Sequence, residues 1–290
     1  RGAGRGAPTV VSRTEDAVVN VFKIGNLDVI AVADGEVSFP AKGYFAGTTD
    51  AQWEPHARWT DHAGNLVFPF GCFVVRSGER RVLIDTGLGP ITFGEYRGGE
   101  LLGQLEEAGV RPSDIDVVFI THLHADHCGS AALKIDGQMR PTFPNATYRW
   151  TAAEQTFWTG GDLPPGSIAR KDIFAAVASR WEAADGGASL APGIDVYSMP
   201  GHTPGHAGVV LSSGDARAFI LGDGISCPVQ LEEPEWSGLG DVDPKLARRS
   251  QEALAREVEG TGTLVGTSHF PGLTFGRVLT GEGRRYWQAV

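Results

Sequence analysis

Cysteine is scarce in this chain, and the few cysteines form no pattern. Three occur among 290 residues, at Cys72, Cys128 and Cys227, and no two of them make a Cys-x-x-Cys pair. Such a set supplies neither a disulfide framework nor a thiolate zinc site. We therefore expect three small buried side chains without a chemical role.

The chain is also poor in basic residues and in long apolar runs. Lys and Arg together number 25 against 35 Asp and Glu, which gives a formal net charge of −10. Phosphate backbones bind to clustered Lys and Arg, so we do not expect nucleic acid as a partner. No run of eighteen apolar residues occurs, and no membrane partner or membrane-spanning segment is predicted. We expect a cytoplasmic protein; the periplasm and the exterior stay open because the chain does not begin with Met.

Strand-like and helical segments alternate in mixed order along most of the chain. Residues 17–39 predict a β-hairpin around Gly25-Asn26, and 244–259 a helix capped by Asp243. Two β-rich halves, each with helices, predict an α/β (α+β) sandwich of two mixed sheets with helices on the outer faces. We expect residues 17–290 to form a single domain and residues 1–16 a flexible N-terminal segment.

Two long segments, 40–65 and 224–242, show no regular period, and we expect both to be loops at one edge of the sandwich. The first contains four large or titratable ring side chains. They would either cap a pocket or support the interface of a homodimer, and a plain surface loop is the third alternative. These side chains are Trp53, His56, Trp59 and His62.

A short segment rich in histidine follows the predicted strand at 116–121. Its sequence is Thr121-His122-Leu123-His124-Ala125-Asp126-His127. Residues i and i+2 of an extended chain point the same way, so His122 and His124 can bind one metal together. The chain then turns, and Asp126 and His127 would face the other side of the same pocket. One loop can thus serve two metal ions.

Further ligand-type residues follow predicted strands later in the chain. His202, Asp223 and His269 each lie among Gly or Pro residues, which suit the tight turns around a site. Taken with the histidine segment, they complete a set of seven side chains for two divalent cations. Imidazole and carboxylate without thiolate favour Zn²⁺, with Mn²⁺, Fe²⁺ or Co²⁺ as alternatives.

This pattern resembles that of the metallo-β-lactamase superfamily over about residues 65–275. The matching motifs are the Asp85-Thr86-Gly87 turn, the 122–127 segment, Gly201-His202-Thr203-Pro204-Gly205-His206, Gly222-Asp223 and Ser268-His269. The resemblance implies the αββα sandwich of that fold, with residues 17–290 as one catalytic domain and the site at the edge between the sheets.

The resemblance also implies a role for each matching position. His122, His124 and His202 are similar to the ligands of a first metal. Asp126, His127 and His269 are similar to those of a second, and Asp223 resembles a carboxylate that bridges both. Asp85 resembles a residue that supports the ligand loop. His206 matches a position that is not usually a ligand, and Cys128 is left out of the set.

Within the superfamily the set most resembles the N-acyl-homoserine lactonase and methyl parathion hydrolase branch. The segment Phe270-Pro271-Gly272 after the last ligand, preceded by the predicted helix, carries this likeness. A basic C-terminal cluster of the glyoxalase II kind is lacking. A glyoxalase II-like thioesterase and a mononuclear-iron sulfur dioxygenase remain as less favoured alternatives. A non-catalytic binding module would be expected to lack ligands, and all seven are here.

We therefore hypothesise a dinuclear-metal hydrolase in which a metal-bridging hydroxide attacks a lactone or ester, such as an acyl-homoserine lactone. Hydrolysis of organophosphate triesters is the runner-up. Asp126 and Asp223 are the candidates for passing a proton. Five aromatic residues could line an apolar pocket for a small-molecule ester, lactone or phosphotriester, and ordinary core packing is the equal alternative. They are Phe68, Phe70, Phe93, Trp158 and Phe270.

Overall fold

The computed structural model describes residues 20–160, 163 and 169–290. The predicted flexible segment 1–16 lies outside these residues. No helix of the described part is both long and apolar enough to cross a membrane.

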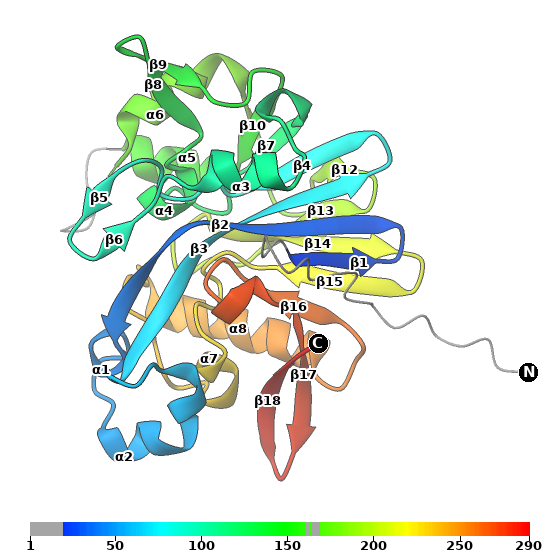
Figure 1. Cartoon of the computed structure of the whole chain (residues 1–290). Coiled ribbons are helices and arrows are strands. Elements are labelled where there is room, and N and C mark those ends of the chain that lie inside the picture. Colours follow the sequence, from blue (N-terminus) through cyan, green and yellow to red (C-terminus); the bar gives the residue numbers. More distant parts are fainter. Residues whose placement is uncertain (1–19, 161–162, 164–168) are drawn as a thin grey trace, which may run out of the picture.

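Two large β-sheets dominate the described part of the chain (Figure 1). The first has the order β11-β10-β7-β4-β3-β2-β6-β5, with β1 paired to β2. Its strands are β1 (Asn20–Ile24), β2 (Leu27–Pro40), β3 (Asn65–Ser77), β4 (Arg80–Ile84), β5 (Thr92–Phe93), β6 (Tyr96–Arg97), β7 (Val117–Phe119), β10 (Thr147–Trp150) and β11 (Trp181–Ala183).

The second sheet follows the chain order from β12 to β18. Its strands are β12 (Ser189–Ala191), β13 (Ile194–Ser198), β14 (Ala207–Ser213), β15 (Ala216–Ile220), β16 (Leu264–Gly266), β17 (Gly276–Gly281) and β18 (Arg284–Ala289). A separate hairpin joins β8 (Ala132–Ile135) to β9 (Gln138–Pro141).

Helices cover the outer faces of the two sheets. The α-helices are α1 (Ala41–Tyr44), α2 (Asp50–Trp53), α3 (Leu101–Glu107), α4 (Ala125–Cys128), α5 (Ala152–Thr159), α6 (Lys171–Val177), α7 (Val229–Glu232) and α8 (Pro244–Val258). Short 3₁₀ turns are η1 (Glu54–Trp59), η2 (Pro112–Asp114), η3 (Ala178–Arg180) and η4 (Pro271–Leu273). Figure 1 shows α3, α5 and α6 in the upper part of the molecule and α8 in the lower part.

Three layers of apolar side chains hold the sandwich together. The central layer lies between the sheets and includes Val29 from β2 and Val209 from β14, both fully buried. A second layer packs the first sheet against α3, α5 and α6, and a third packs the second sheet against α8. Each large apolar side chain buried in this way contributes about 1.5–3 kcal/mol. The predicted αββα architecture is confirmed.

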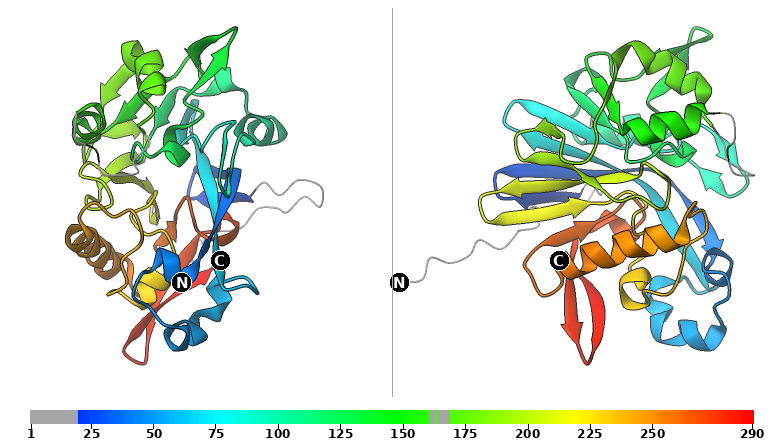
Figure 2. Two further views of the ribbon diagram at one scale, coloured as in Figure 1. Left: turned by 90° about the vertical axis from the view of Figure 1, so that its left-hand side faces the viewer. Right: turned by 180° about the vertical axis from the view of Figure 1, so that it is seen from behind.

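Helix α8 shows why the sequence specifies these elements locally. Asp243 accepts a hydrogen bond from Leu246 N at 3.0 Å, and Pro244 occupies the first turn. The buried residues Ala247, Leu254 and Val258 repeat at helical spacing and form the face against the second sheet. In the view from behind, this orange helix lies beside the yellow strands β13–β15 (Figure 2).

The segment 40–65 is not the irregular loop that the sequence predicted. It contains α1, α2 and η1, and it packs against the segment that contains α7. His56 lies between two carboxylates, at 3.1 Å from Glu232 Oε2 and 3.1 Å from Glu233 Oε1. The helical turns are too short to show a period, which explains why the sequence concealed them. Both segments lie at one edge of the sandwich, as expected.

Candidate metal centre

The seven predicted side chains reach one edge of the sandwich from both sheets. His122 and His124 follow β7 of the first sheet, and α4 directly continues with Asp126 and His127. The other three lie in loops of the second sheet: His202 precedes β14, Asp223 follows β15 and His269 follows β16. Strands β15 and β16 are parallel neighbours, so the residues that follow them emerge at the same edge.

These side chains form two groups with closely spaced donor atoms. One group consists of His122, His124, His202 and Asp223, and the other of Asp126, His127 and His269. Within each group the candidate donor atoms lie within 4.8 Å of one another. We call them the first and the second group. All seven residues come together, and the division follows the one that the resemblance implied.

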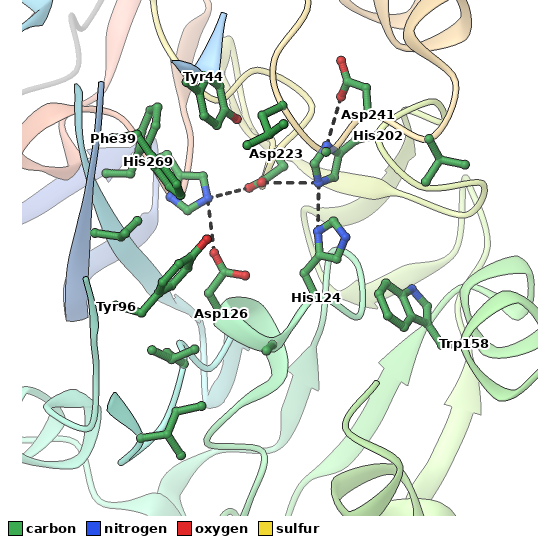
Figure 3. Close-up of a pocket in the computed structure, with 18 of the residues that line it drawn as sticks. Phe39, Tyr44, Tyr96, His124, Asp126, Trp158, His202, Asp223, Asp241 and His269 are labelled. Carbon is green, nitrogen blue, oxygen red and sulfur yellow. Dashed lines mark hydrogen bonds and ion pairs between the residues drawn. The ribbon is translucent and has the colours of Figure 1, made fainter. Parts of the chain in front are cut away.

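Asp223 lies between the two groups. Its Oδ1 is 2.9 Å from His269 Nε2 and 3.0 Å from His127 Nε2, and its Oδ2 is 3.4 Å from His202 Nε2. In the first group, His124 Nδ1 is 3.0 Å from His202 Nε2. Figure 3 shows His202 between Asp223, His124 and Asp241. A carboxylate in this position can contact two cations at once.

Two buried atoms of the centre have no hydrogen-bond partner among the described residues. They are His127 Nε2 and Asp223 Oδ1, which face each other without hydrogen-bond geometry. Unpaired polar atoms in a protein interior cost free energy, and native structures rarely leave them so. A cation bound by both atoms would remove this cost. The donor set therefore fits divalent metal ions.

The opposite ring nitrogens of three histidines are held by oxygen acceptors. His127 Nδ1 lies 2.8 Å from Asp85 Oδ2, His202 Nδ1 lies 3.0 Å from Asp241 Oδ1, and His269 Nδ1 lies 2.7 Å from the carbonyl oxygen of Pro69. Carboxylate and carbonyl oxygens accept, so each Nδ1 carries the proton. In the neutral form of each ring, Nε2 then directs its lone pair at the centre, as a metal ligand requires.

Burial governs the protonation of the remaining imidazoles. It lowers the pKa of His124 to about 3, and the neighbouring His202 acts in the same direction. Burial, together with His127 and His124, also holds the pKa of His122 well below its ordinary value. For Asp223, burial raises the pKa, but the charges of His269 and His127 outweigh it and lower that pKa well below the usual range. For His127, His202 and His269, burial alone would lower the pKa, but the neighbouring carboxylates outweigh it and raise the pKa. Metal binds to neutral imidazole and ionised carboxylate, so a bound cation would displace a proton from these three rings.

Asp85 supports the second group from a tight turn at the end of β4. Its backbone is left-handed, with φ 59°, a conformation that Asp tolerates better than most residues. The buried carboxylate accepts hydrogen bonds from Thr121 N (2.8 Å) and Ser268 Oγ (3.1 Å), besides His127 Nδ1. It thus ties the histidine segment to the loop that carries His269, in agreement with the supporting role that the resemblance implies.

His206 and Cys128 lie outside both groups. His206 Nε2 accepts a hydrogen bond from the backbone N–H of Asp223 at 3.1 Å, and its Nδ1 donates to Met199 O at 3.0 Å. The Cys128 thiol is buried in the layer between the first sheet and its helices. Neither side chain is a candidate ligand, as the sequence reading held.

Sequence reasoning missed two carboxylates that support the first group. Asp241 lies in the predicted loop 224–242, and no pattern around it points to His202. Glu154 belongs to α5 and is fully buried. Glu154 lies three residues after Thr151, the N-cap of α5, which is the spacing of a capping box. The sequence therefore suggests a helix cap, and the hydrogen bonds of this side chain to the ligand loops could not be foreseen. Burial raises the pKa of Glu154, and the hydrogen bonds it accepts act in the opposite direction.

A pocket of about 650 Å³ opens onto the centre, large enough for a drug-sized molecule. Apart from residues of the centre, the wall is mainly apolar and aromatic. It is formed by Val37, Phe39, Tyr44, Phe68, Leu88, Ile91, Tyr96, Ala125, Phe157, Trp158, Leu239, Gly240, Asp241 and Val242. Figure 3 shows the hydroxyl ends of Tyr44 and Tyr96 directed toward the ligand side chains.

The predicted lining is correct for Phe68 and Trp158 and wrong for two other aromatics. Phe70 is fully buried behind the pocket, where it stacks on Tyr96. Phe270 packs against Trp287 in the layer under α8. Both follow core packing, the alternative reading. The side chain of Phe93 lies outside the described part.

The predicted cap over the pocket also needs correction. None of Trp53, His56, Trp59 and His62 lines it. Trp53 packs against Phe45 and Trp236 in a buried aromatic cluster, because its ring is more stable away from water. Phe39 and Tyr44, at the start of the same stretch, form the wall instead. The dimer interface stays a prediction.

Comparison with known proteins gives the family. The sequence model of the metallo-beta-lactamase superfamily matches residues 72–269. An N-acyl homoserine lactonase from Bacillus cereus is 24% identical over 216 residues, which cover 67% of this chain and 79% of that protein. Metallo-beta-lactamase domain-containing protein 1 from Homo sapiens is 26% identical over 60% of this chain, and the match spans 53% of the human protein's length.

Solved structures support the same fold. AidC, described as a dizinc quorum-quenching lactonase, superposes with a TM-score of 0.84 at 23% identity, over 94% of this chain and 97% of its own. The hydrolase AbOPH of the beta lactamase superfamily gives 0.83 at 24% identity, over 96% and 99%. The predicted superfamily is confirmed, and it agrees with the prediction of a metal-dependent hydrolase. With its family motifs gathered at one edge of two packed sheets, this chain belongs to the metallo-β-lactamase superfamily.

Proposed function

We propose that this chain is a dinuclear-metal hydrolase of small, uncharged lactones and esters, with acyl-homoserine lactones as the leading candidates. One observation carries the proposal. Five imidazoles and two carboxylates converge in two groups at the base of a largely apolar pocket. Lactonases among the sequence relatives and the structural neighbours support the substrate class.

His122, His124 and His202 would hold one cation, and Asp126, His127 and His269 the other, with Asp223 shared between them. We propose Zn²⁺, because the ligands are imidazole and carboxylate and the chain contributes no thiolate. Two such ions, when bound, would lower the pKa of a shared water towards neutrality and polarise a carbonyl oxygen. The chain itself contributes the five imidazoles and the two carboxylates that would keep both ions in place.

Asp126 is the proposed proton carrier nearest to the substrate. Its side chain is the more exposed of the two ligand carboxylates, with 20% of its surface accessible to solvent against 8% for Asp223. It also lines the pocket. Tyr96 lines the same part of the wall. Burial and the nearby carboxylates of Asp126 and Asp223 raise the pKa of Tyr96 to about 12. The phenol therefore stays protonated at neutral pH, as a hydrogen-bond donor must.

The charge of the wall argues for uncharged substrates. None of the described residues that line the pocket is Lys or Arg, whereas Asp126, Asp223 and Asp241 all contribute to it. Bound cations would neutralise Asp126 and Asp223, but no Lys or Arg of the described wall could pair with the remote carboxylates of an anionic substrate, such as the glutathione thioesters of a glyoxalase II-like enzyme. Neutral phosphotriesters meet no such barrier, so the same observation keeps them as the second candidate.

The test combines metal analysis with a substrate panel. Protein purified without chelator is expected to contain two zinc-like ions per chain by mass spectrometry. Lactones with acyl chains of several lengths, aryl esters, phosphotriesters and an anionic thioester are then compared by kcat/KM. Acyl lactones are expected to rank first and the thioester last.

Three outcomes would contradict the proposal, the last of them only its substrate class. One iron per chain with oxygen consumption would indicate the sulfur dioxygenase alternative. Turnover that survives complete removal of metal would contradict hydrolysis at this centre. A rank order led by phosphotriesters would replace the substrate class and leave the metal centre intact.

A further inference from the structure

We propose that Glu154 is a positioning residue that holds the first group together and leaves the second group unaffected. This inference rests on the proposed metal centre. It concerns a residue that does not line the pocket described above, but whose carboxylate accepts hydrogen bonds from both loops that carry the imidazoles of the first group.

The carboxylate of Glu154 accepts four hydrogen bonds from three separate parts of the chain. Oε2 accepts from Leu123 N at 3.0 Å, and Leu123 lies between His122 and His124. Oε1 accepts from Thr203 Oγ1 and from Gly205 N, the latter at 3.0 Å. The loop that carries two of the imidazoles and the loop that carries His202 therefore share one anchor.

The fourth hydrogen bond fixes a ring against the centre. Trp158 Nε1 donates to Glu154 Oε2 at 2.7 Å. The indole then packs edge-on to His124, with ring centroids 5.3 Å apart and an interplanar angle of 82°. Glu154 thus restrains His124 twice, through the backbone at Leu123 and through the ring of Trp158.

Close backbone packing shows that this arrangement is built into the fold. At Gly205, a Cβ atom would collide with the backbone nitrogen of Glu154 and with Thr151 Oγ1. Thr151 also donates to the carbonyl of Gly205 at 2.7 Å. The N-terminal turn of α5 can meet the His202 loop this closely only because residue 205 is glycine.

The four hydrogen bonds of Glu154 involve no side chain of the second group, whose anchor is Asp85. Loss of a residue that orients metal ligands typically weakens metal binding by about 10–100-fold. If Glu154 acts as proposed, its removal should weaken one site selectively. A merely structural role in α5 would instead weaken both sites together with the fold.

The experiment uses two single-site backgrounds. His269→Ala leaves the first group complete, and His202→Ala leaves the second group complete. Glu154→Gln, which keeps the size of the side chain, is added to each. Zinc affinity is measured by competition with a chromogenic chelator, and folding is followed by circular dichroism and Tm. Glu182→Gln, the same change at an exposed position on β11, is the matched control.

We expect Glu154→Gln to lower zinc affinity by about 10–100-fold in the His269→Ala background and by less than about 2-fold in the His202→Ala background. The control should change neither. Equal losses in both backgrounds, or none in either, would overturn the role of Glu154. A wild-type chain that binds no zinc would instead contradict the proposed function.

A gentler variant keeps the test decisive if Glu154→Gln does not fold. Thr203→Val removes one donor to the carboxylate and keeps the shape and charge of the site. It should lower affinity by about 3–10-fold in the His269→Ala background alone, less than Glu154→Gln, because the other three hydrogen bonds to the carboxylate remain. No selective loss with Thr203→Val would likewise overturn the proposal.

Discussion

The two halves of the metal centre are held by different parts of the fold. The second group is supported from within the sheets, by Asp85 at the end of β4 and by the carbonyl of Pro69 in β3. The first group is supported from outside them, by Glu154 on α5 and by Asp241 in the segment that lines the pocket. The sheet core therefore fixes one half, whereas the elements that shape the pocket also hold the other. Changes in the pocket wall should reach the first group before the second.

Asp223→Ala should have the largest effect, because the Asp223 carboxylate contacts both groups and its loss should weaken metal binding in both. We expect two-site metal binding to disappear and kcat/KM to fall by more than about 1,000-fold, since the charge stabilisation of the transition state is lost. Metal content by mass spectrometry and lactone hydrolysis measure the two effects. A variant that keeps both ions and most of its activity would remove Asp223 from the centre.

Asp85→Asn should weaken metal binding in the second group more than in the first, because Asp85 supports the second group from the first sheet. The amide cannot accept all the hydrogen bonds that Thr121, His127 and Ser268 donate to the carboxylate. We expect zinc affinity in the His202→Ala background, which retains the second group, to fall by about 10–100-fold. The His269→Ala background should lose less, because Asp85 reaches the first group only indirectly, through Thr121, whose Oγ1 lies 3.2 Å from His122 Nδ1. If both backgrounds lose equally, the two halves do not have separate supports.

Asp241→Asn tests the same difference from the side of the pocket. It keeps an acceptor for His202 Nδ1 but removes the negative charge. We expect a loss of about 3–10-fold in zinc affinity, confined to the His269→Ala background, together with a raised KM for lactones. Affinity lost from the second group would show that the pocket wall and the sheet core are coupled.

Leu239→Ala should affect substrate binding in the pocket and leave both groups of ligands unchanged. The side chain of Leu239 lines the pocket and remains 57% exposed, so a bound acyl chain can cover it. We expect KM for long-chain lactones to rise by about 3–10-fold, because part of an apolar contact is lost, and short-chain lactones to be unaffected. An equal rise for both chain lengths would place the acyl chain elsewhere. Metal content is the control and should not change.

Asp243→Ala should have the smallest effect, because its side chain caps α8 and belongs to neither half. Loss of an N-cap costs about 1 kcal/mol of unfolding free energy, which lowers Tm by roughly 2–4 °C. Zinc affinity should stay as in wild type. A selective loss from the first group would mean that α8 also supports His202.

How far the sequence predicted this structure differs from one part to another. The 122–127 segment was informative because imidazoles at alternate positions after a strand have few purely structural uses. Helix α8 was predicted to within one residue, since its cap, its proline and its apolar period all agree. Strands β17 and β18 were missed because their sequences are short and polar, and only pairing with β16 and with each other defines them.

The supports of the metal centre could not be predicted, and the reason is physical. Glu154 and Asp241 support the first group through hydrogen bonds to residues far away in the sequence, which leave no periodic trace. The aromatic residues were equally ambiguous. Nothing in the sequence distinguishes Phe70 and Phe270, which are buried in the core, from Phe68, which lines the pocket. Which side of a strand faces a pocket depends on the packing of both sheets.

The route by which the ligands arrive has a mechanical consequence. Each group combines residues that follow β7 of one sheet with residues from loops of the other. Each bound cation would therefore cross-link the two sheets at the edge where the site lies. Loading the centre would then stiffen the whole margin, because a cation that binds only the assembled site stabilises that assembly. Chelation should accordingly loosen the sandwich first where substrate enters, and hydrogen exchange along β7 and β15 would report it.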